Sequence, residues 1–114
     1  MNIDELTQSF RNISNEKKLQ DLVHWIVAWK IGDEDVRELE AMVEKCFGNM
    51  WLQSQADHSN AYKLWSEFKR DAIGGIGGMT MNERLFFFGL FERFDQSDTE
   101  EQKRAVYSKL LAKP

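Results

Sequence analysis

Residues 71–95 read DAIGGIGGMTMNERLFFFGLFERFD, and this stretch poses the main question about the fold. Four glycines fall within residues 74–78, and five of the chain's eight phenylalanines follow within residues 86–94. Glycines before a helix either hold a phosphate group or join two helices. The residues on both sides decide between these two functions.

Neither nucleotide-binding motif is complete in this stretch. A dinucleotide-binding loop needs G-x-G-x-x-G between a strand and a helix. With Gly75 and Gly77 as the first two glycines, Thr80 stands where the third belongs. Residues 64–72, which come before the loop, have helical spacing. A P-loop needs Gly-Lys followed by Ser or Thr, and residues 70–102 contain no lysine.

We therefore interpret the glycine segment as a joint where two helices meet, since glycine allows positive φ and close packing. Thr80 and Glu83 have the spacing of a capping box, which uses the backbone donors that an anion would need. Arg84 projects on the apolar side of the next helix, so it needs a carboxylate or carbonyl partner. A second hypothesis is an adaptable contact loop, because ordering four glycines is entropically costly. The predicted structural residues are Gly74, Gly75, Gly77, Gly78, Thr80, Glu83 and Arg84.

Outside this stretch, apolar residues recur at three- and four-residue steps, which predicts helices almost throughout. Four expected helices come before the glycines: residues 3–13, a helix from a Ser14 or Asn15 cap to about Lys30, a helix from an Asp33 cap to Gly48, and a helix over about 59–72. A fifth helix is expected to run unbroken from Thr80 through the phenylalanines, and a sixth to begin at the capping box of residues 97–100.

The expected apolar arc of the fifth helix contains Phe87, Phe88, Leu90, Phe91 and Phe94. Leu85 and Phe86 flank its polar face and are expected to be only partly covered. The predicted fold is all-α, a compact single-domain bundle of about six short helices, with residues 1–114 forming one helical domain.

The composition indicates a cytoplasmic protein. Hydrophobic residues make up 42% and charged residues 30% of the 114 residues, and no apolar run approaches the ~20 residues of a membrane span. The start does not resemble a signal peptide, because Asn2, Asp4 and Glu5 stand where a basic region belongs. The single cysteine, Cys46, cannot form an internal disulfide.

The sequence contains no recognisable catalytic or metal-binding set, so we expect neither an enzyme nor a cofactor. His24, Cys46 and His58 are the only soft or imidazole ligands, and no two have metal-ligand spacing. The net charge of −4 argues against nucleic acid as a partner. We expect no membrane partner and a monomer in the free protein.

The third predicted helix has an acidic outer face, which is either an ordinary solvated face or a docking surface for a basic protein. Two tryptophans, one at the edge of the second helix and one in the connector after the third, are candidate aromatic anchors beside it, although both are also plausible core residues. The candidate partner-binding residues are Asp33, Glu34, Arg37, Glu38, Glu40, Glu44, Trp25 and Trp51.

The G-G-M-T-x-N-E-R-L sequence of residues 77–85, extended over residues 72–95, resembles a motif of small bacterial proteins. Several of those proteins are similar to immunity proteins of polymorphic or contact-dependent growth-inhibition toxins. The matching stretch covers about a fifth of the 114-residue chain. The resemblance implies a cytosolic protein that binds a cognate toxin domain, such as a nuclease, and blocks its active site or substrate groove.

Three other functions remain open at this stage. A regulatory protein-interaction module has the same sequence features as an immunity protein. A small-ligand-binding bundle requires a cavity, which the phenylalanine-rich arc could line. A nucleic-acid-binding protein requires five basic residues to converge on one side: Lys17, Lys18, Lys63, Lys69 and Arg70.

Overall fold

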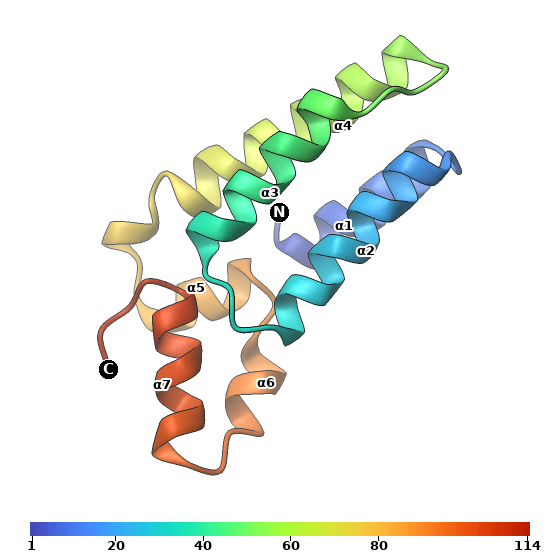
Figure 1. The fold of residues 1–114 in the computed structure, drawn as a ribbon. Coiled ribbons are helices and arrows are strands. Elements are labelled where there is room, and N and C mark those ends of the chain that lie inside the picture. Colours follow the sequence, from blue (N-terminus) through green and yellow to red (C-terminus); the bar gives the residue numbers. More distant parts are fainter.

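The computed structural model describes residues 1–114, and the protein is an all-α bundle, as predicted (Figure 1). Seven α-helices follow one another: α1 (Ile3–Ile13), α2 (Lys17–Ile31), α3 (Val36–Asn49), α4 (Gln55–Phe68), α5 (Met81–Phe87), α6 (Phe91–Asp95) and α7 (Glu100–Lys109). A π-helical turn, Lys69–Ile73, extends α4, and a 3₁₀ turn, Ile76–Gly78, lies before α5. No helix is both long and apolar enough to cross a membrane.

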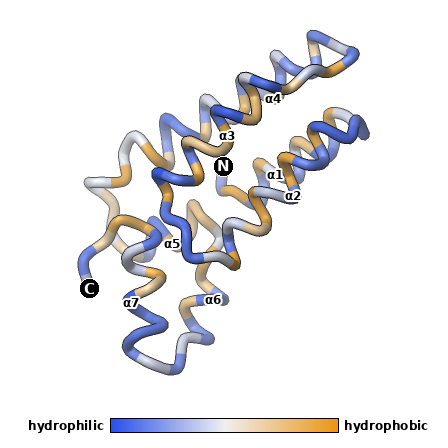
Figure 2. Tube along the Cα trace, viewed as in Figure 1, coloured by the Kyte–Doolittle hydropathy of each residue, from blue (hydrophilic) through white to orange (hydrophobic).

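Two helical hairpins make up the long part of the molecule, which measures 47 × 25 × 21 Å (Figure 1). The first hairpin is α1–α2 and the second is α3–α4, and the three C-terminal helices lie where α2 ends and α3 begins. The turn between α1 and α2 and the turn between α6 and α7 are hydrophilic, as Figure 2 shows. At the far tip, Gln53 N–H donates to the Glu16 carboxylate at 2.9 Å and joins the two hairpins.

A single core of 23 buried hydrophobic residues draws on both hairpins and on the C-terminal helices. Phe88 has no exposed surface, and its ring packs 5.7 Å from Trp29 of α2 and 5.6 Å from Phe68 of α4. Trp65 is equally buried and stacks on Phe68 at 5.9 Å. Each fully buried aromatic side chain contributes roughly 1.5–3 kcal/mol. These rings therefore join the C-terminal segment to both hairpins.

The expected unbroken fifth helix is wrong, because the chain turns at Gly89. This glycine has φ +63°, a left-handed conformation that ends a helix and that a side chain strains. The break rotates α6 away from the arc of α5, so Phe91 is 42% exposed instead of buried. Leu85, expected to be partly covered, is fully buried, whereas Phe86 is exposed.

Several predicted helix starts are displaced by one to four residues. Asp35, not Asp33, caps α3, because only Asp35 has a glutamate, Glu38, three residues later to complete the capping box. Likewise Thr99 with Gln102, not Ser97 with Glu100, caps α7. The α2 cap position is Glu16, and α4 begins at Gln55 after a Ser54 cap. The third helix continues one residue past Gly48.

Candidate protein-binding surface

The turn that joins α2 to α3 is held by hydrogen bonds within the two helices. Gly32 N–H donates to Ala28 O at 3.1 Å and stands at the C-terminal cap of α2. Asp35 accepts from Glu38 N–H at 2.9 Å at the start of α3. Trp29 Nε1–H donates to Asp35 O at 2.9 Å and links the end of α2 to the start of α3.

Two cations from the C-terminal helices bind the carbonyl groups at the end of α2. Lys109 Nζ donates to the oxygens of Trp29, of Gly32 at 2.9 Å and of Glu34 at 2.7 Å. Arg93 Nη1 donates to Lys30 O at 2.7 Å and to Gly32 O at 2.8 Å. The last carbonyls of a helix lack intrahelical partners and carry partial negative charge, so both cations stabilise this end.

Lys109 is buried with 1% of its surface exposed, and its ammonium lies 3.8 Å from the centre of the Trp29 ring. Burial, helped by the nearby Arg93 charge, lowers the pKa of Lys109 to about 8, although Glu34, Asp33 and Glu38 act in the opposite direction. Sequence reasoning missed this residue. Its position beside the buried Val106 and Leu110 was the available signal that it lies on the inner face.

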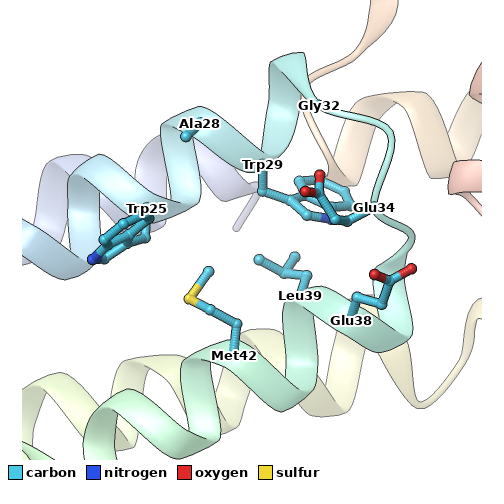
Figure 3. Close-up of a pocket in the computed structure, with 8 residues that line it drawn as sticks. All are labelled: Trp25, Ala28, Trp29, Gly32, Glu34, Glu38, Leu39 and Met42. Atoms are coloured by element: carbon cyan, nitrogen blue, oxygen red, sulfur yellow. The ribbon is translucent and has the colours of Figure 1, made fainter.

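A groove runs along the α2–α3 interface next to this turn. It has a volume of about 230 Å³ and is lined mainly by hydrophobic side chains of both helices (Figure 3). Trp25 stands at one end, and the carboxyl groups of Glu34 and Glu38 lie at the other, with Leu39 and Met42 between them. We call this hollow the acidic groove. Neither of its carboxylates forms an ion pair.

Trp25 also lines a second hollow of about 250 Å³ farther along the same interface. This hollow has Lys18 and Lys45 at its rim together with Asp21. The α2–α3 face therefore changes from negative near the turn to mixed charge toward the tip, and Trp25 lies between the two parts.

Both candidate aromatic anchors are exposed, and the alternative that they belong to the core is wrong. Trp25 is 56% and Trp51 is 67% exposed. Trp51 lies away from the carboxylates of the acidic groove, because it follows the far end of α3, roughly 20 Å from Glu38 along the helix axis at 1.5 Å per residue. Ile31, at the end of α2, is more exposed than either at 77%.

The five predicted acidic-face residues near the turn have different environments. Glu34 and Glu38 line the acidic groove, and Glu38 also completes the α3 capping box. Asp33 is exposed and lies 3.4 Å from Arg93. Arg37 is exposed and Glu40 is half-buried, and neither lines the groove. The structure thus brings Trp25, Glu34 and Glu38 together and leaves Asp33, Arg37 and Glu40 beside them.

Glu44 lies outside this surface and instead connects α3 to α4. Its carboxylate accepts hydrogen bonds from Tyr62 at 3.1 Å and from Trp65 Nε1 at 3.2 Å, and it pairs with Lys69. Burial raises the pKa of Glu44, but the hydrogen bonds from Lys69, Trp65 and Tyr62 outweigh it and lower the pKa overall. The contacts of Glu44 therefore hold two helices together and leave it outside the candidate partner-binding surface.

In the glycine segment, the prediction of positive φ is wrong, because Gly89 is the one glycine of the chain with a left-handed backbone. Gly74 does serve a close approach, since a Cβ there would lie 2.8 Å from Arg70 O. A Cβ at Gly77 or Gly78 would meet no atom within 4 Å, and both residues are exposed. Packing therefore accounts for Gly74 but not for Gly77 or Gly78.

The predicted capping box and the predicted carbonyl partners of Arg84 are present. Thr80 accepts from Glu83 N–H at 3.1 Å, and Glu83 accepts from Thr80 N–H at 3.0 Å. These hydrogen bonds lower the pKa of Glu83. Arg84 is buried and finds carbonyl partners, donating to Leu110 O at 2.9 Å and to Met79 O at 3.2 Å. The motif therefore anchors the start of α5 to the end of α7.

The five basic residues considered for nucleic-acid binding do not form one free basic face. Lys17 and Lys18 begin α2 near the tip of the molecule, whereas Lys69 and Arg70 follow the opposite end of α4 (Figure 1). Lys69 pairs with Glu44, and Arg70 lies 3.1 Å from the Asp71 carboxylate.

Soft ligands and imidazoles are dispersed, and no three His, Cys, Asp or Glu side chains are placed to hold a metal ion. His24 is exposed beside Trp25, and His58 lies 3.3 Å from Phe47 O. Burial raises the pKa of the half-buried Cys46 thiol, which disfavours the reactive thiolate.

Compared with known proteins, the chain matches no family model, no curated protein and no solved structure.

Proposed function

We propose that this protein is an immunity protein that binds a cognate toxin domain through its α2–α3 face and blocks the toxin by occlusion. The observation that carries the proposal is the placement of the exposed Trp25 on an apolar groove with unpaired carboxylates at its end. The motif resemblance of residues 72–95 supplies the class of partner.

The chemistry of the α2–α3 face suits protein recognition. Tryptophan is enriched among the residues that dominate binding energy, and such anchors are surrounded by contacts that exclude water. An exposed apolar groove that ends in charged groups is typical of an interaction surface. Carboxylates that face solvent without ion pairs favour a partner with basic groups and speed its association.

The proposed mechanism involves no chemical step by this chain. A nuclease toxin carries a basic groove for nucleic acid. An acidic inhibitor seated on that groove excludes the substrate and neutralises the charge that would attract it. The groove of about 230 Å³ is smaller than the ~300–1,000 Å³ of typical small-molecule sites, so a protein side chain fits it better than a cofactor.

The test is co-expression with the product of the neighbouring upstream gene. We expect that product to arrest growth when expressed alone, that this chain restores growth, and that the two purify as a one-to-one complex. A non-toxic neighbour that still binds in one-to-one proportion would contradict the toxin assignment and support a regulatory interaction module.

Single substitutions of the two exposed tryptophans locate the contact surface. Trp25→Ser is expected to weaken the complex by about 2 kcal/mol, roughly 30-fold in Kd, as for an interface hot spot. Trp51→Ser is the control, since Trp51 is also exposed and does not line the acidic groove. Equal loss of affinity in both variants, or loss in neither, would remove the groove as the binding site.

A further inference from the structure

We infer that the acidic groove receives one arginine side chain of the partner protein. This inference rests on the proposed function in that it assumes a protein partner, and it specifies the group that this partner must insert. The other occupants of such a groove, a lysine or an uncharged apolar side chain, are separate outcomes of the test below.

The groove combines the two environments that an arginine side chain needs. Its walls are apolar, formed by Trp25 and Ala28 of α2 and by Leu39 and Met42 of α3. Such walls cover the methylene groups of a long cationic side chain, while the charged head reaches polar groups at the edge.

The two carboxylates lie at one end of the groove, where the head of the side chain would stop (Figure 3). The Glu34 side chain has no hydrogen-bond partner in the protein, and Glu38 accepts one backbone hydrogen bond, from Asp35 N–H at 3.3 Å. Both therefore keep free acceptor oxygens. A guanidinium has five donors in a planar fork, so one head can reach two carboxylates at once.

These features favour arginine over lysine. The guanidinium is planar and more weakly hydrated than an ammonium, so it loses less hydration free energy on entering an apolar groove. Lysine offers a compact, strongly hydrated charge and lacks the planar fork of donors that can reach two carboxylates at once.

The buried Lys109 does not prevent a second cation from binding nearby. Its ammonium lies against Trp29 and points its donors at the carbonyls of Trp29, Gly32 and Glu34. The partial negative charge of this helix end offsets the Lys109 charge. Glu34 and Glu38, which line the groove, also act favourably on that ammonium, since both carboxylates raise its pKa.

The probe is N-acetyl-arginine amide, and the readout is the NMR shift of the four tryptophan indole N–H signals of the isolated protein. We expect a saturable shift of the Trp25 signal, identified by its loss in Trp25→Leu, and no shift of Trp51. Two comparison probes are N-acetyl-citrulline amide, which has the same shape without the charge, and N-acetyl-lysine amide, with a free ammonium side chain. Each should bind at least about fivefold more weakly than the arginine probe, which corresponds to about 1 kcal/mol of binding free energy.

Two variants test the carboxylates. Glu34→Gln and Glu38→Gln should each weaken the arginine probe several-fold, and glutamine at position 38 keeps the capping box intact. Glu101→Gln is the matched control because it removes the same charge from an exposed site on α7. Equal weakening by all three variants would show only a general charge effect and overturn the inference.

The remaining outcomes are also decisive. A Trp25 shift that stays linear up to about 50 mM arginine probe, or an equal response to citrulline, overturns the arginine site. An equal response to the lysine probe replaces it with a general cation site. None of these results depends on a toxin, so a failed co-expression test with successful arginine binding rejects the immunity function alone. Toxin neutralisation without arginine binding rejects this inference alone.

Discussion

The ammonium of Lys109 lies 3.8 Å from the centre of the Trp29 ring, although the two residues are 80 positions apart in the chain. Lys109 also donates to the backbone oxygen of Trp29. The last helix therefore supports the end of α2 from inside the protein, directly behind the acidic groove. This contact makes the geometry of the proposed binding surface depend on the C-terminal helix.

Lys109 is expected to make the free energy of unfolding rise with pH above about 8. Its pKa is about 8 in the folded protein and 10.5 ordinarily, so the unfolded chain binds more protons between these values and stability increases with pH. At about 1.4 kcal/mol per pKa unit, the full gain is on the order of 3 kcal/mol. Urea unfolding at pH 7 to 10 under reducing conditions measures it.

The control for this prediction is Lys109→Met. The difference in the free energy of unfolding between wild type and variant removes the contributions of the other titrating groups. Cys46 is one such group, since its raised thiol pKa lowers stability with pH above about 9. The free energy of unfolding of the wild type, relative to that of Lys109→Met, should increase between pH 8 and 10. A difference that stays constant over this range would show that Lys109 titrates normally in the folded protein.

Glu44→Lys should lower the free energy of unfolding by about 2 kcal/mol or more. The variant leaves the indole N–H of the buried Trp65 without its acceptor and places a second ammonium beside Lys69. Lys45→Glu is the matched charge reversal at the next, exposed position and should change stability by less than about 0.5 kcal/mol. Similar denaturation midpoints for the two variants would refute the bridging role of Glu44.

Gly89→Ala should destabilise the protein by about 1–2 kcal/mol from backbone strain alone. Gly89 has φ +63°, and a Cβ there would lie 2.6 Å from Asp4 Oδ2 and 3.0 Å from Lys30 Nζ, so it also disturbs that ion pair. Gly77→Ala is the control, since its Cβ would meet nothing within 4 Å, and it should be neutral or stabilising by up to about 1 kcal/mol. Thermal unfolding of both variants checks the contrast.

Gly77→Ala also tests the contact-loop hypothesis. If the exposed glycines 77 and 78 serve only to connect helices, the stable variant should bind the partner as tightly as wild type. A tenfold loss of affinity, equal to about 1.4 kcal/mol of binding free energy, without loss of stability would instead place this loop in the interface.

Phe88→Ala should cost about 3–5 kcal/mol, because Phe88 is fully buried between Trp29 and Phe68. Phe91→Ala should cost much less, about 1 kcal/mol, because this ring is 42% exposed. The comparison tests the break at Gly89 directly. Comparable losses in chemical denaturation would indicate that α5 and α6 form the continuous helix that the sequence suggests.

Short-range interactions explain why much of the fold is predictable. The apolar spacing of α1 and the Thr80–Glu83 capping box depend on residues three or four positions apart, so they are readable without the tertiary structure. The same local chemistry supports the all-α fold and the requirement of Arg84 for carbonyl partners. Even there, competing caps two residues apart, such as Asp33 and Asp35, left helix starts uncertain by a few residues.

The candidate binding surface depended more on tertiary contacts. Sequence spacing made Glu34, Glu38 and Glu44 candidates for one acidic face, but it could not show that Glu44 pairs with Lys69, 25 residues later. The sequence also could not show which tryptophans stay exposed. A tryptophan at the edge of a helix's apolar face is buried or exposed according to which element packs against that face.

The sequence alone thus determined the helical character of this protein, its acidity and its local caps, because these follow from neighbouring residues and overall composition. Only the tertiary structure decided that the chain breaks at Gly89 against Asp4 and Lys30, that Lys109 is buried behind Trp29, and that Trp25 meets two free carboxylates across a groove. The physical reason is that these contacts join residues far apart in the chain, and their energies depend on burial and distance after the helices have packed.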